Sequence, residues 1–572
     1  MAETLISPGV LARENDQSFI GGAPITFGAA IIGPAVKGPV GIPTAVSTFS
    51  QYQAIFGGSV ESGSQFYTYL NSIAASNYFS QGGESLLVTR VVTGSFLSAV
   101  TSGSTATQFN NSGISTVGWN NSGGGGAQDL GYQKDAFQLS TISEGEIMNN
   151  YQANDSAGGT LDNGNADNLR WEVSNVNTSS GQFSLLIRRG NDTTNQKAIV
   201  ETFSNVSMDP TAANYVSAVI GDSYATVASD NGEYFDNNGT AKDLYTGSLP
   251  AVGSGSFAPA VTGTSLGNNF ENGDAKFNQN IDGNNIQGIG PNDYTESIAL
   301  LNNQDQYQFN VISTPGLNSY EHSPQVNLMV ALAQSRTDCI SVIDLVPYNS
   351  NVLTVTSQAA AFDTSYSATY WPWLQTIDAA TSQNVWVPPS TFIPGVYAFT
   401  DASSDPWFAP AGLIRGSLGT VVRAERQLTS GNRDSLYEAN VNPIATFPGS
   451  GIVVFGQKTL QKKASALDRV NVRRLLISLK SFISQVSNNL VFEQNTIATR
   501  NNFLAQVNPY LESVQQRQGL YSFKVVMDDS NNTPDVVDRN QLIGQIYLQP
   551  TKTTEFIILD FNVLPTGATF PE

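Results

Sequence analysis

Residues able to do acid–base or nucleophilic chemistry are scarce in this chain of 572 residues. His322 is the only histidine and Cys339 the only cysteine. These counts exclude four kinds of site: a triad with a second orienting histidine, a metal site of several imidazoles, a CxxC zinc site and an intrachain disulfide. Cys339 has apolar neighbours in TDCISVIDLVP, which is typical of a buried structural thiol. A single histidine in a loop, as in NSYEHSPQ, is most often just a polar residue.

Other catalytic and binding motifs are equally weak. The chain has no GxxxxGK[ST] motif, and no GxGxxG between a strand and a helix. DNGNADN (162–168) loosely resembles a calcium loop, but it lacks the EF-hand spacing and the closing glutamate, which favours a turn. Asp528 and Asp529 lie in a predicted turn, and nothing indicates a glycosidase-type carboxylate pair. We therefore predict no catalytic, cofactor-binding or metal-binding residue, and no enzyme.

Charge is sparse and unevenly placed. The formal net charge is −20, yet only 13% of residues are charged, against roughly 25% in a typical soluble domain. Residues 96–299 hold 7 basic and 21 acidic residues, whereas residues 451–527 hold 10 basic and 3 acidic residues. Regions of opposite sign usually face different surroundings.

The sequence shows no sign of secretion or membrane insertion. The start, MAETLISPGV, does not resemble a signal peptide, and the apolar stretch ITFGAAIIGPAV is too short to cross a bilayer. We therefore expect the protein to fold in a cytoplasm without a membrane anchor.

The basic region centres on LDRVNVRRLLISLKSFISQVSNN (467–489), whose apolar residues repeat with helical spacing. Arg469, Arg473 and Lys480 lie off that apolar stripe and form a basic face. By itself such a face is most often solvated. Nucleic-acid binding is disfavoured because no aromatic residues interleave with the basic ones, and a membrane surface because the apolar stripe is needed for the core. A partner with an acidic surface is the remaining alternative.

The elements that position these residues indicate several domains. We predict a mixed α+β or α/β multidomain fold, with mixed-sheet core domains, a large β-rich insertion and extended N- and C-terminal arms. A second helix is predicted near 496–518, where Pro509 should kink it or divide it into two shorter helices. An earlier helix is predicted in SQFYTYLNSIAASNYFSQGG (64–83), where Gly82 and Gly83 should end it. The expected divisions are an arm at 1–22, a discontinuous core at 23–95 plus 300–440, an insertion at 96–299 and a C-terminal α/β domain at 441–572.

Several segments together resemble the tail sheath proteins of contractile-tailed, myovirus-type bacteriophages. They cover roughly residues 5–92 and 305–565. The segments are SPGVLARE (7–14), GPAVKGPVGIPTAVSTFSQYQAIFGG (33–58), NYFSQGGESLLVTRVV (77–92), a Pro- and Trp-rich stretch from YWPW to PWFAPAG, and LYEANVNPIATFPGSGIVVFGQKTL (436–460) followed by RVNVRRLLISLKSFISQVSNNLVFEQN (469–495).

The resemblance implies a structural virion protein. Sheath subunits form stacked rings around an inner tail tube and contract to drive the tube through the host envelope, with baseplate and tail terminator proteins as further partners. It implies no cofactor, no direct nucleic-acid binding and no membrane insertion. Extended arms add strands to a neighbouring subunit, and the C-terminal domain faces the tube. The implied arm residues are Val10, Leu11, Ala12, Arg13, Phe556, Ile557, Ile558 and Leu559, and the implied tube-facing residues are Arg469, Arg473 and Lys480.

Two alternatives remain open at this point. One is the sheath of a phage-derived contractile bacteriocin or injection system. The other, from a different class, is a β-rich adhesin or carbohydrate-binding protein that uses the insertion as its binding region. Assembly in a host bacterial cytoplasm followed by residence in the virion is expected for the phage sheath.

Overall fold

The computed structural model describes residues 28–62, 65–92, 100–104, 135–140, 169–177, 179–189, 197, 199–207, 212–220, 225–227, 234–236, 252–256 and 281–555. The chain divides into two compact units. The central unit is Phe27–Arg474, and the C-terminal unit combines Leu475–Glu572 with Met1–Thr26. The predicted arm residues Val10 to Arg13 and Phe556 to Leu559 lie outside the described residues.

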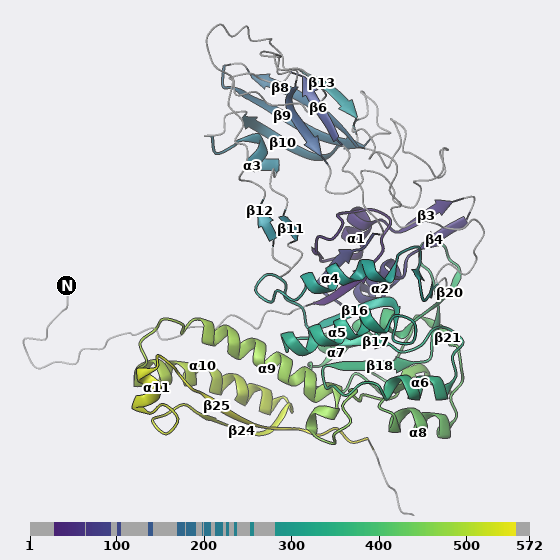
Figure 1. Cartoon of the computed structure of the whole chain (residues 1–572), viewed down its shortest axis with the longest axis vertical. Helices are drawn as coiled ribbons and strands as arrows, with labels where there is room; N and C mark the ends of the chain where they lie inside the picture. Colours follow the sequence, from purple (N-terminus) through teal and green to yellow (C-terminus); the bar gives the residue numbers. More distant parts are fainter. Residues whose placement is uncertain are drawn as a thin grey trace, which may run out of the picture. The chain divides into compact units, whose positions relative to one another are not determined.

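An eight-stranded sheet forms the core of the central unit (Figure 1). Its order is β2 (Thr44–Val46), β5 (Leu86–Arg90), β1 (Ala29–Gly33), β16 (Val311–Asn318), β17 (Ile340–Asp344), β18 (Ser367–Trp371), β22 (Asn442–Phe447) and β23 (Gly451–Val454). The six inner strands run parallel, and β2 and β23 are antiparallel edges. Inner strands such as AAIIG and ISVID are buried along their whole length because a parallel sheet is covered on both faces.

Helices cover both faces of this sheet. A Cβ added at Gly33 would meet the Asn71 side chain of α2, whereas the preceding residue Ile32 lies in the cluster that holds residues of α4 and α5. Successive strand residues point to opposite faces, so α2 and the α4–α5 pair flank the sheet. The helices of the unit are α1 (Phe49–Phe56), α2 (Leu70–Ser80), α4 (Tyr294–Leu300), α5 (Ser323–Arg336), α6 (Val352–Ala359), α7 (Ile393–Ser403) and α8 (Ser430–Glu438).

Small sheets complete the central unit. β3 (Ser59–Ser62) pairs with β4 (Gln65–Thr68), β14 (Ile281–Asp282) with β15 (Asn285–Ile286), and β19 (Leu374–Ile377) with β20 (Asn384–Val387) and β21 (Val421–Ala424). The prediction of a helix from residue 64 was wrong at its start. Phe66 belongs to strand β4, and α2 begins only at Leu70.

The described part of residues 96–299 is mainly strand. A four-stranded antiparallel sheet joins β10 (Ile199–Ser207), β9 (Gln182–Arg189), β8 (Leu169–Asn177) and β13 (Gly253–Ser256). Its own small core contains Trp171, Phe183 and Leu185. Further elements are β6 (Val100–Ser104), β7 (Asp135–Ser140), β11 (Ala225–Val227), β12 (Tyr234–Asp236) and α3 (Val216–Ile220). By contrast, Ile286 and Ile298 pack into the main core cluster of the central unit.

Two long helices and a two-stranded sheet form the described C-terminal unit. Helix α9 (Val470–Asn488) begins in the central unit and continues past its boundary at Arg474. It is followed by α10 (Ile497–Gln516), β24 (Leu520–Val526), α11 (Pro534–Asp538) and β25 (Gln545–Pro550). Pro509 lies inside α10, so of the two outcomes predicted for it the division into two shorter helices does not occur.

The observed elements make this a mixed α/β protein. None of the helices in the described ranges is long and apolar enough to cross a membrane.

Candidate assembly surface of the C-terminal unit

The apolar stripe of α9 is buried as its spacing predicts. Val472, Leu475, Leu479, Phe482 and Val486 are each at most 8% exposed. The opposite helix α10 buries Phe503, Val507, Leu511 and Val514. Within the C-terminal unit the two helices are tied by the rings of Phe482 and Tyr510, whose centroids lie 3.8 Å apart. This pair of helices is the support on which the strands of the unit lie.

The basic face predicted on α9 is wrong for Arg473. Its side chain is 4% exposed, and its guanidinium lies 3.9 Å from the centroid of the Tyr366 ring. Its Nε donates to the Ser365 carbonyl at 3.2 Å and its Nη2 to the Ser365 hydroxyl. Burial lowers the pKa of Arg473, and Tyr366 opposes that shift. The residue therefore fastens the first turn of α9 inside the central unit and cannot present its charge to another protein in this structure.

Arg474 is a second buried cation, which the sequence pattern placed only at the edge of the apolar stripe. Its Nη2 lies 2.6 and 2.5 Å from the two carboxylate oxygens of Asp401 on α7. The guanidinium also stacks 4.6 Å from the Tyr397 ring centroid, and the Tyr397 hydroxyl is 2.8 Å from that of Tyr370. Desolvation raises the pKa of Asp401, and the Arg474 charge opposes that shift. Both members of this pair come from the central unit, so it anchors the start of α9 there.

The other two predicted contact residues keep some exposure. Arg469 is 24% exposed in its side chain and forms an ion pair with the adjacent Asp468 at 3.0 Å. Lys480 is exposed on the part of α9 that belongs to the C-terminal unit. The structure therefore does not gather Arg469, Arg473 and Lys480 into one exposed basic surface.

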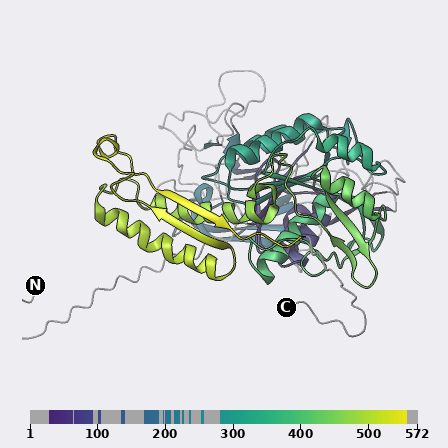
Figure 2. The same cartoon turned by 90° about the horizontal axis from the view of Figure 1, so that it is seen from below.

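The sheet of the C-terminal unit is narrow, and its outer edges are unpaired among the described residues. β24 and β25 pair only with each other, with Phe523 opposite Leu548 and Lys524 opposite Tyr547. Figure 2 shows the two strands running alongside the helices of the unit. An isolated two-stranded sheet is marginally stable, and an open edge offers unpaired N–H and C=O groups to another strand. The edges of this sheet are therefore suited to accept a strand from elsewhere.

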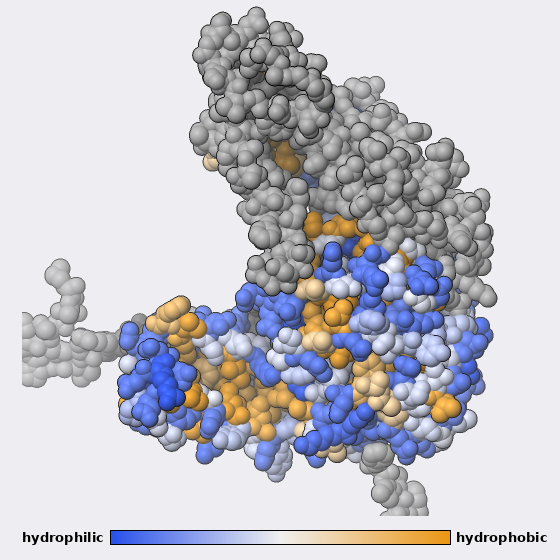
Figure 3. Space-filling view, viewed as in Figure 1, coloured by the Kyte–Doolittle hydropathy of each residue, from blue (hydrophilic) through white to orange (hydrophobic). Residues whose placement is uncertain are grey.

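Apolar side chains remain partly exposed on this sheet. Phe523, Val525, Ile546 and Leu548 alternate along the two strands on one face and are only half-buried. On the other face, Tyr547 is 57% exposed. Figure 3 shows a band of hydrophobic surface across the C-terminal unit, over the region of α10 and β25. The two described strands are too few to bury the apolar surface of this unit.

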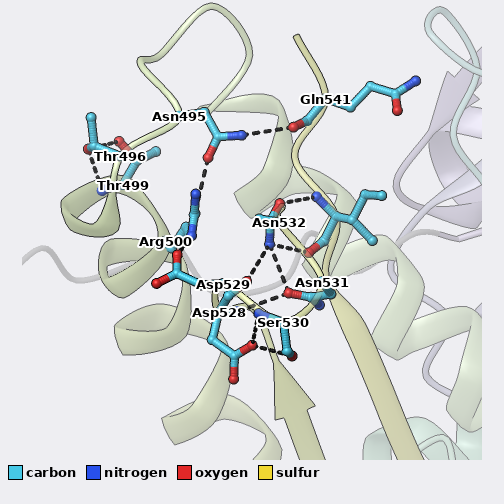
Figure 4. Close-up of polar contacts among 11 residues, drawn as sticks. Asn495, Thr496, Thr499, Arg500, Asp528, Asp529, Ser530, Asn531, Asn532 and Gln541 are labelled. Carbon is cyan, nitrogen blue, oxygen red and sulfur yellow. Dashed lines mark hydrogen bonds and ion pairs between the residues drawn. The ribbon is translucent and has the colours of Figure 1, made fainter. Parts of the chain in front are cut away.

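A polar network holds the connection between β24 and β25 against the start of α10 (Figure 4). The buried Arg500 donates from Nε to Asn495 Oδ1 at 3.1 Å and pairs through Nη1 with Asp529 at 2.6 Å. Asn495 in turn donates to the Gln541 carbonyl at 2.8 Å. Asn532 accepts from the Ile543 amide and donates to the Ile543 carbonyl. This end of the unit is thus an ordered structure.

The α9–α10 connection and the first residue of α10 lie at this braced end and expose three apolar side chains. Phe492 is 100% exposed, Ile497 64% and Val491 58%. Phe492 also has a positive φ of 72°, which costs a bulky residue on the order of 1–3 kcal/mol. The turn is closed by hydrogen bonds from the Val491 amide to the Asn488 carbonyl and from the Glu493 amide to the Leu490 carbonyl. The sequence-based prediction did not include this exposed tip, although the apolar pair Val491 and Phe492 between two predicted helices indicated it.

Titratable groups outside this surface serve the core of the central unit. Cys339 is fully buried as predicted, and burial raises the pKa of its thiol. His322 is 1% exposed, contrary to the expectation of an ordinary loop residue: its Nδ1 accepts from the Asn318 amide, and its Nε2 lies 2.8 Å from the Asp282 carbonyl. Burial lowers the pKa of His322. In the part of the chain that the structure describes, no three histidine, cysteine, aspartate or glutamate residues could hold a metal ion.

The most unusual carboxyl group belongs to Asp344, at the end of β17. It is 4% exposed and accepts from the Ser390 amide at 3.2 Å and from the Ser390 hydroxyl at 2.5 Å. Desolvation raises the pKa of Asp344 to about 7, although both hydrogen bonds oppose the shift. It lies inside the core and touches no surface described above, so we assign it an effect on stability.

Comparison with known proteins places these elements in a family. Residues 287–460 match the phage tail sheath protein central domain, and residues 462–564 match the phage tail sheath C-terminal domain. Over 220 residues the chain is 40% identical to the tail sheath protein of Vibrio phage KVP40, which covers 38% of this chain and 32% of that protein. Over 225 residues it is 36% identical to the tail sheath protein of Enterobacteria phage T4, covering 39% and 33%.

A solved structure gives a matching fold over more of the chain. The sheath tail protein of Listeria innocua superposes with a TM-score of 0.50 at 10% identity, covering 92% of this chain and 95% of that one. At this identity the likeness shows the fold alone. The matched part of the chain spans about a third of the length of the two phage relatives.

The fold defines the class as a modular, mixed α/β protein, and among the described residues its C-terminal unit carries a two-stranded sheet with both edges open. The two family matches and the phage relatives together support a contractile phage tail sheath protein. The family consists of structural proteins.

Proposed function

We propose that this chain is the sheath subunit of a contractile phage tail. In this function it polymerises as stacked rings around the inner tail tube and contracts to drive the tube through the host envelope for genome ejection. The observation that carries the proposal is the pair of adjacent sheath domains at residues 287–460 and 462–564. The chain would be assembled in the host cytoplasm and reside in the virion, with the tube, baseplate and tail terminator proteins as partners.

The open sheet of the C-terminal unit supports polymerisation. Addition of a strand from another subunit would pair an edge of β24 or β25 that is open among the described residues, and would cover half-buried residues such as Phe523 and Leu548. The proposed donors are the arms that contain Val10 to Arg13 and Phe556 to Leu559. Contacts of this kind that do not close on themselves generate helical polymers.

The proposed domain roles follow the expected divisions. Residues 1–22 act as a linking arm, residues 23–95 plus 300–440 as the core domain, residues 96–299 as an outer insertion, and residues 441–572 as the tube-facing domain with the second arm. Within the last division, β22 and β23 belong to the central sheet, so the tube-facing role falls to the residues after Arg474. The acidic and amide-rich composition of the insertion suits a solvent-facing layer. For the tube contact we retain Lys480 and Arg469 as candidates, whereas the burial of Arg473 removes it.

A contractile bacteriocin or injection system would use the same subunit chemistry, and the genes that flank this one separate the two: capsid and packaging genes accompany a phage sheath. The adhesin alternative has no specific observation in its favour.

Negative-stain electron microscopy of the purified protein, with and without its tube protein, tests the proposal. We expect rings or tubes of regular repeat, whereas discrete particles under all conditions would contradict a sheath function. Deleting residues 1–14 should leave a folded monomer by circular dichroism but abolish ordered tubes. Tubes like those of the wild type would exclude the N-terminal arm as the link.

A further inference from the structure

We propose that the β14–β15 hairpin is an acid-releasable strap, which stays docked on the central unit only while the His322 ring is neutral. In the chain, this hairpin follows β13, the last described strand of the insertion sheet, and precedes α4. Because the inference concerns a single chain, its failure would leave the proposed sheath function standing. His322 is the only histidine in the sequence, and histidine is the side chain that ordinarily titrates nearest to neutral pH.

The first argument is that the hydrogen bonds of His322 require a neutral ring. Its Nδ1 lies 3.2 Å from the backbone nitrogen of Asn318, and its Nε2 lies 2.8 Å from the carbonyl oxygen of Asp282. A backbone N–H can only donate and a carbonyl oxygen can only accept, so Nδ1 must be unprotonated and Nε2 must carry the hydrogen. A second proton on Nδ1 would point at the Asn318 N–H and break that bond. The bond from Nε2 to β14 therefore belongs to the neutral ring alone.

The second argument is that a charged ring would lack a hydrogen-bonded counter-ion. His322 is 1% exposed, and burial lowers its pKa, whereas the carboxylates of Glu321 and Asp282 oppose that shift. Both carboxylates have other partners, because Glu321 accepts from the Asn318 side-chain amide and Asp282 accepts from the Asn284 backbone amide. Among the described residues, neither is hydrogen-bonded to the ring. Protonation in place would therefore bury a poorly compensated charge.

The other charged groups around His322 are engaged elsewhere. β16 and the first turn of α5 carry no charged side chain. Asp344, on the neighbouring strand β17, accepts two hydrogen bonds from Ser390. Asp293, in the turn before α4, accepts from the Gly290 amide. We therefore assign the acid response of the hairpin to the imidazole and not to these carboxyl groups.

The third argument is that the hairpin depends on few attachments. β14 and β15 have two residues each, and a two-stranded hairpin is marginally stable by itself. Its other attachments include the buried side chain of Ile286 and a hydrogen bond of 3.0 Å from the Leu70 amide to Gln287 Oε1. A Cβ added at Gly316 would lie 2.9 Å from Ile286, so the hairpin packs directly on the backbone of β16. Loss of the bond between His322 and Asp282 should therefore favour undocking.

Acid is the direction of release. A histidine whose pKa is lower in the fold than its ordinary value of 6.5 contributes its full stability above that value, and loses it as pH falls through the folded pKa. The opening equilibrium of the hairpin should therefore rise about fivefold or more between pH 7.5 and pH 5.5. Asp344 acts with the opposite sign, because its raised pKa favours the folded state at lower pH. The two groups can thus be distinguished.

A direct test of the ring is nuclear magnetic resonance of the full-length protein, made without a histidine tag and with ¹⁵N-labelled histidine. Because the sequence has one histidine, one pair of ring nitrogen signals reports on His322. We expect the neutral form with hydrogen on Nε2 at pH 7.5. A ring that carries hydrogen on Nδ1 at this pH, in either the neutral or the charged form, would overturn the inference.

Hydrogen exchange of the full-length protein, corrected for the intrinsic effect of pH on exchange, measures the release itself. We expect protection of residues 281–289 to fall about fivefold or more from pH 7.5 to pH 5.5, while protection of β22 stays unchanged. In His322→Gln the side-chain amide can still donate to Asp282 but cannot titrate, so hairpin protection should not depend on pH. Asp344→Asn is the matched control and should keep the response of the wild type.

Three outcomes of the exchange experiment contradict the inference. The first is hairpin protection in the wild type that changes less than about twofold, and the second is an equal response in His322→Gln. The third is an equal loss over the hairpin and β22, which would show general acid unfolding. If His322→Gln does not fold, the wild type and Asp344→Asn still decide the question, because both must lose protection at the hairpin alone.

Discussion

The two units of this protein differ in how far their described residues cover their own sheets. The central unit buries cations and pairs them, as with Arg474 and Asp401 or Arg336 and Asp338. The C-terminal unit leaves an aromatic tip exposed and two strand edges unpaired among its described residues. The central unit therefore has a sheet that is covered on both faces, whereas the described part of the C-terminal unit leaves its sheet edges open. We infer that interactions between chains are concentrated in the C-terminal unit.

The largest effect is expected where a paired buried charge is broken in the central unit. Arg474→Ala removes a buried side chain and leaves Asp401, whose side chain is only 22% exposed, without its partner, which should cost about 3 kcal/mol of unfolding free energy. Urea denaturation followed by tryptophan fluorescence measures this loss. The double variant Arg474→Leu with Asp401→Leu should recover most of it, because neither charge is then buried alone. A single variant as stable as the wild type would contradict the role of this pair.

A pH-dependent effect is expected at Asp344. Its pKa is raised to about 7 in the folded protein, against an ordinary value near 3.8, so the folded state binds the proton more tightly than the unfolded state. The stability that this group contributes is present below the unfolded pKa and is lost as pH rises through about 7. Across this range the loss is on the order of 2–4 kcal/mol. Asp344→Asn should remove this slope.

The measurement for Asp344 is the unfolding free energy of the wild type and of Asp344→Asn at pH 5 and at pH 8. Relative to the wild type, we expect the variant to be more stable at pH 8 than at pH 5. Asparagine keeps an acceptor oxygen for Ser390, so the control is Ser390→Ala, which should destabilise the protein at both pH values. A difference that does not change with pH would show that Asp344 is ionised in the fold.

A moderate effect is expected in the network of the C-terminal unit. Arg500→Ala removes bonds to Asn495 and Asp529 and should cost about 1–2 kcal/mol, because Asp529 is itself 83% exposed and its ion pair is screened. Hydrogen exchange of the residues 528–541 connection should rise with little change at β16 and β17. Equal changes in both units would contradict the separation between them.

The smallest effect on stability is expected at the tip. Phe492→Gly relieves the strain of a positive φ but gives the unfolded chain more freedom, and the two effects should cancel to within about 0.5 kcal/mol. Thermal unfolding at matched concentration measures this. A clear loss of stability would mean that the ring packs within the monomer.

Sequence reasoning predicted elements that rest on local periodicity and missed contacts that rest on distant residues. The apolar spacing of α9 and α10 predicted both helices because each stripe lies within one segment. The burial of Arg473 depends on Tyr366, more than a hundred residues away, and no local pattern reveals such a partner. Likewise, the start of α2 was misplaced because Phe66 fits the helical stripe equally well but belongs to the β3–β4 hairpin.

Candidate contact residues were harder to predict for the same reason. A basic residue off an apolar stripe is exposed only if no second element covers it. The Tyr366–Ser365 segment covers Arg473, whereas Lys480 remains exposed. The exposed tip at Phe492 was missed because an apolar residue in a connection is ordinarily expected to fold inward.

Hydrogen exchange of the isolated monomer and of the assembled polymer tests the central claim most directly. If other chains complete the C-terminal unit, backbone amides of β24 and β25 should gain at least about tenfold protection on assembly, while those of β16 and β17 stay unchanged. Protection of β24 and β25 that is the same in monomer and polymer would contradict the claim that this sheet is incomplete in a single chain.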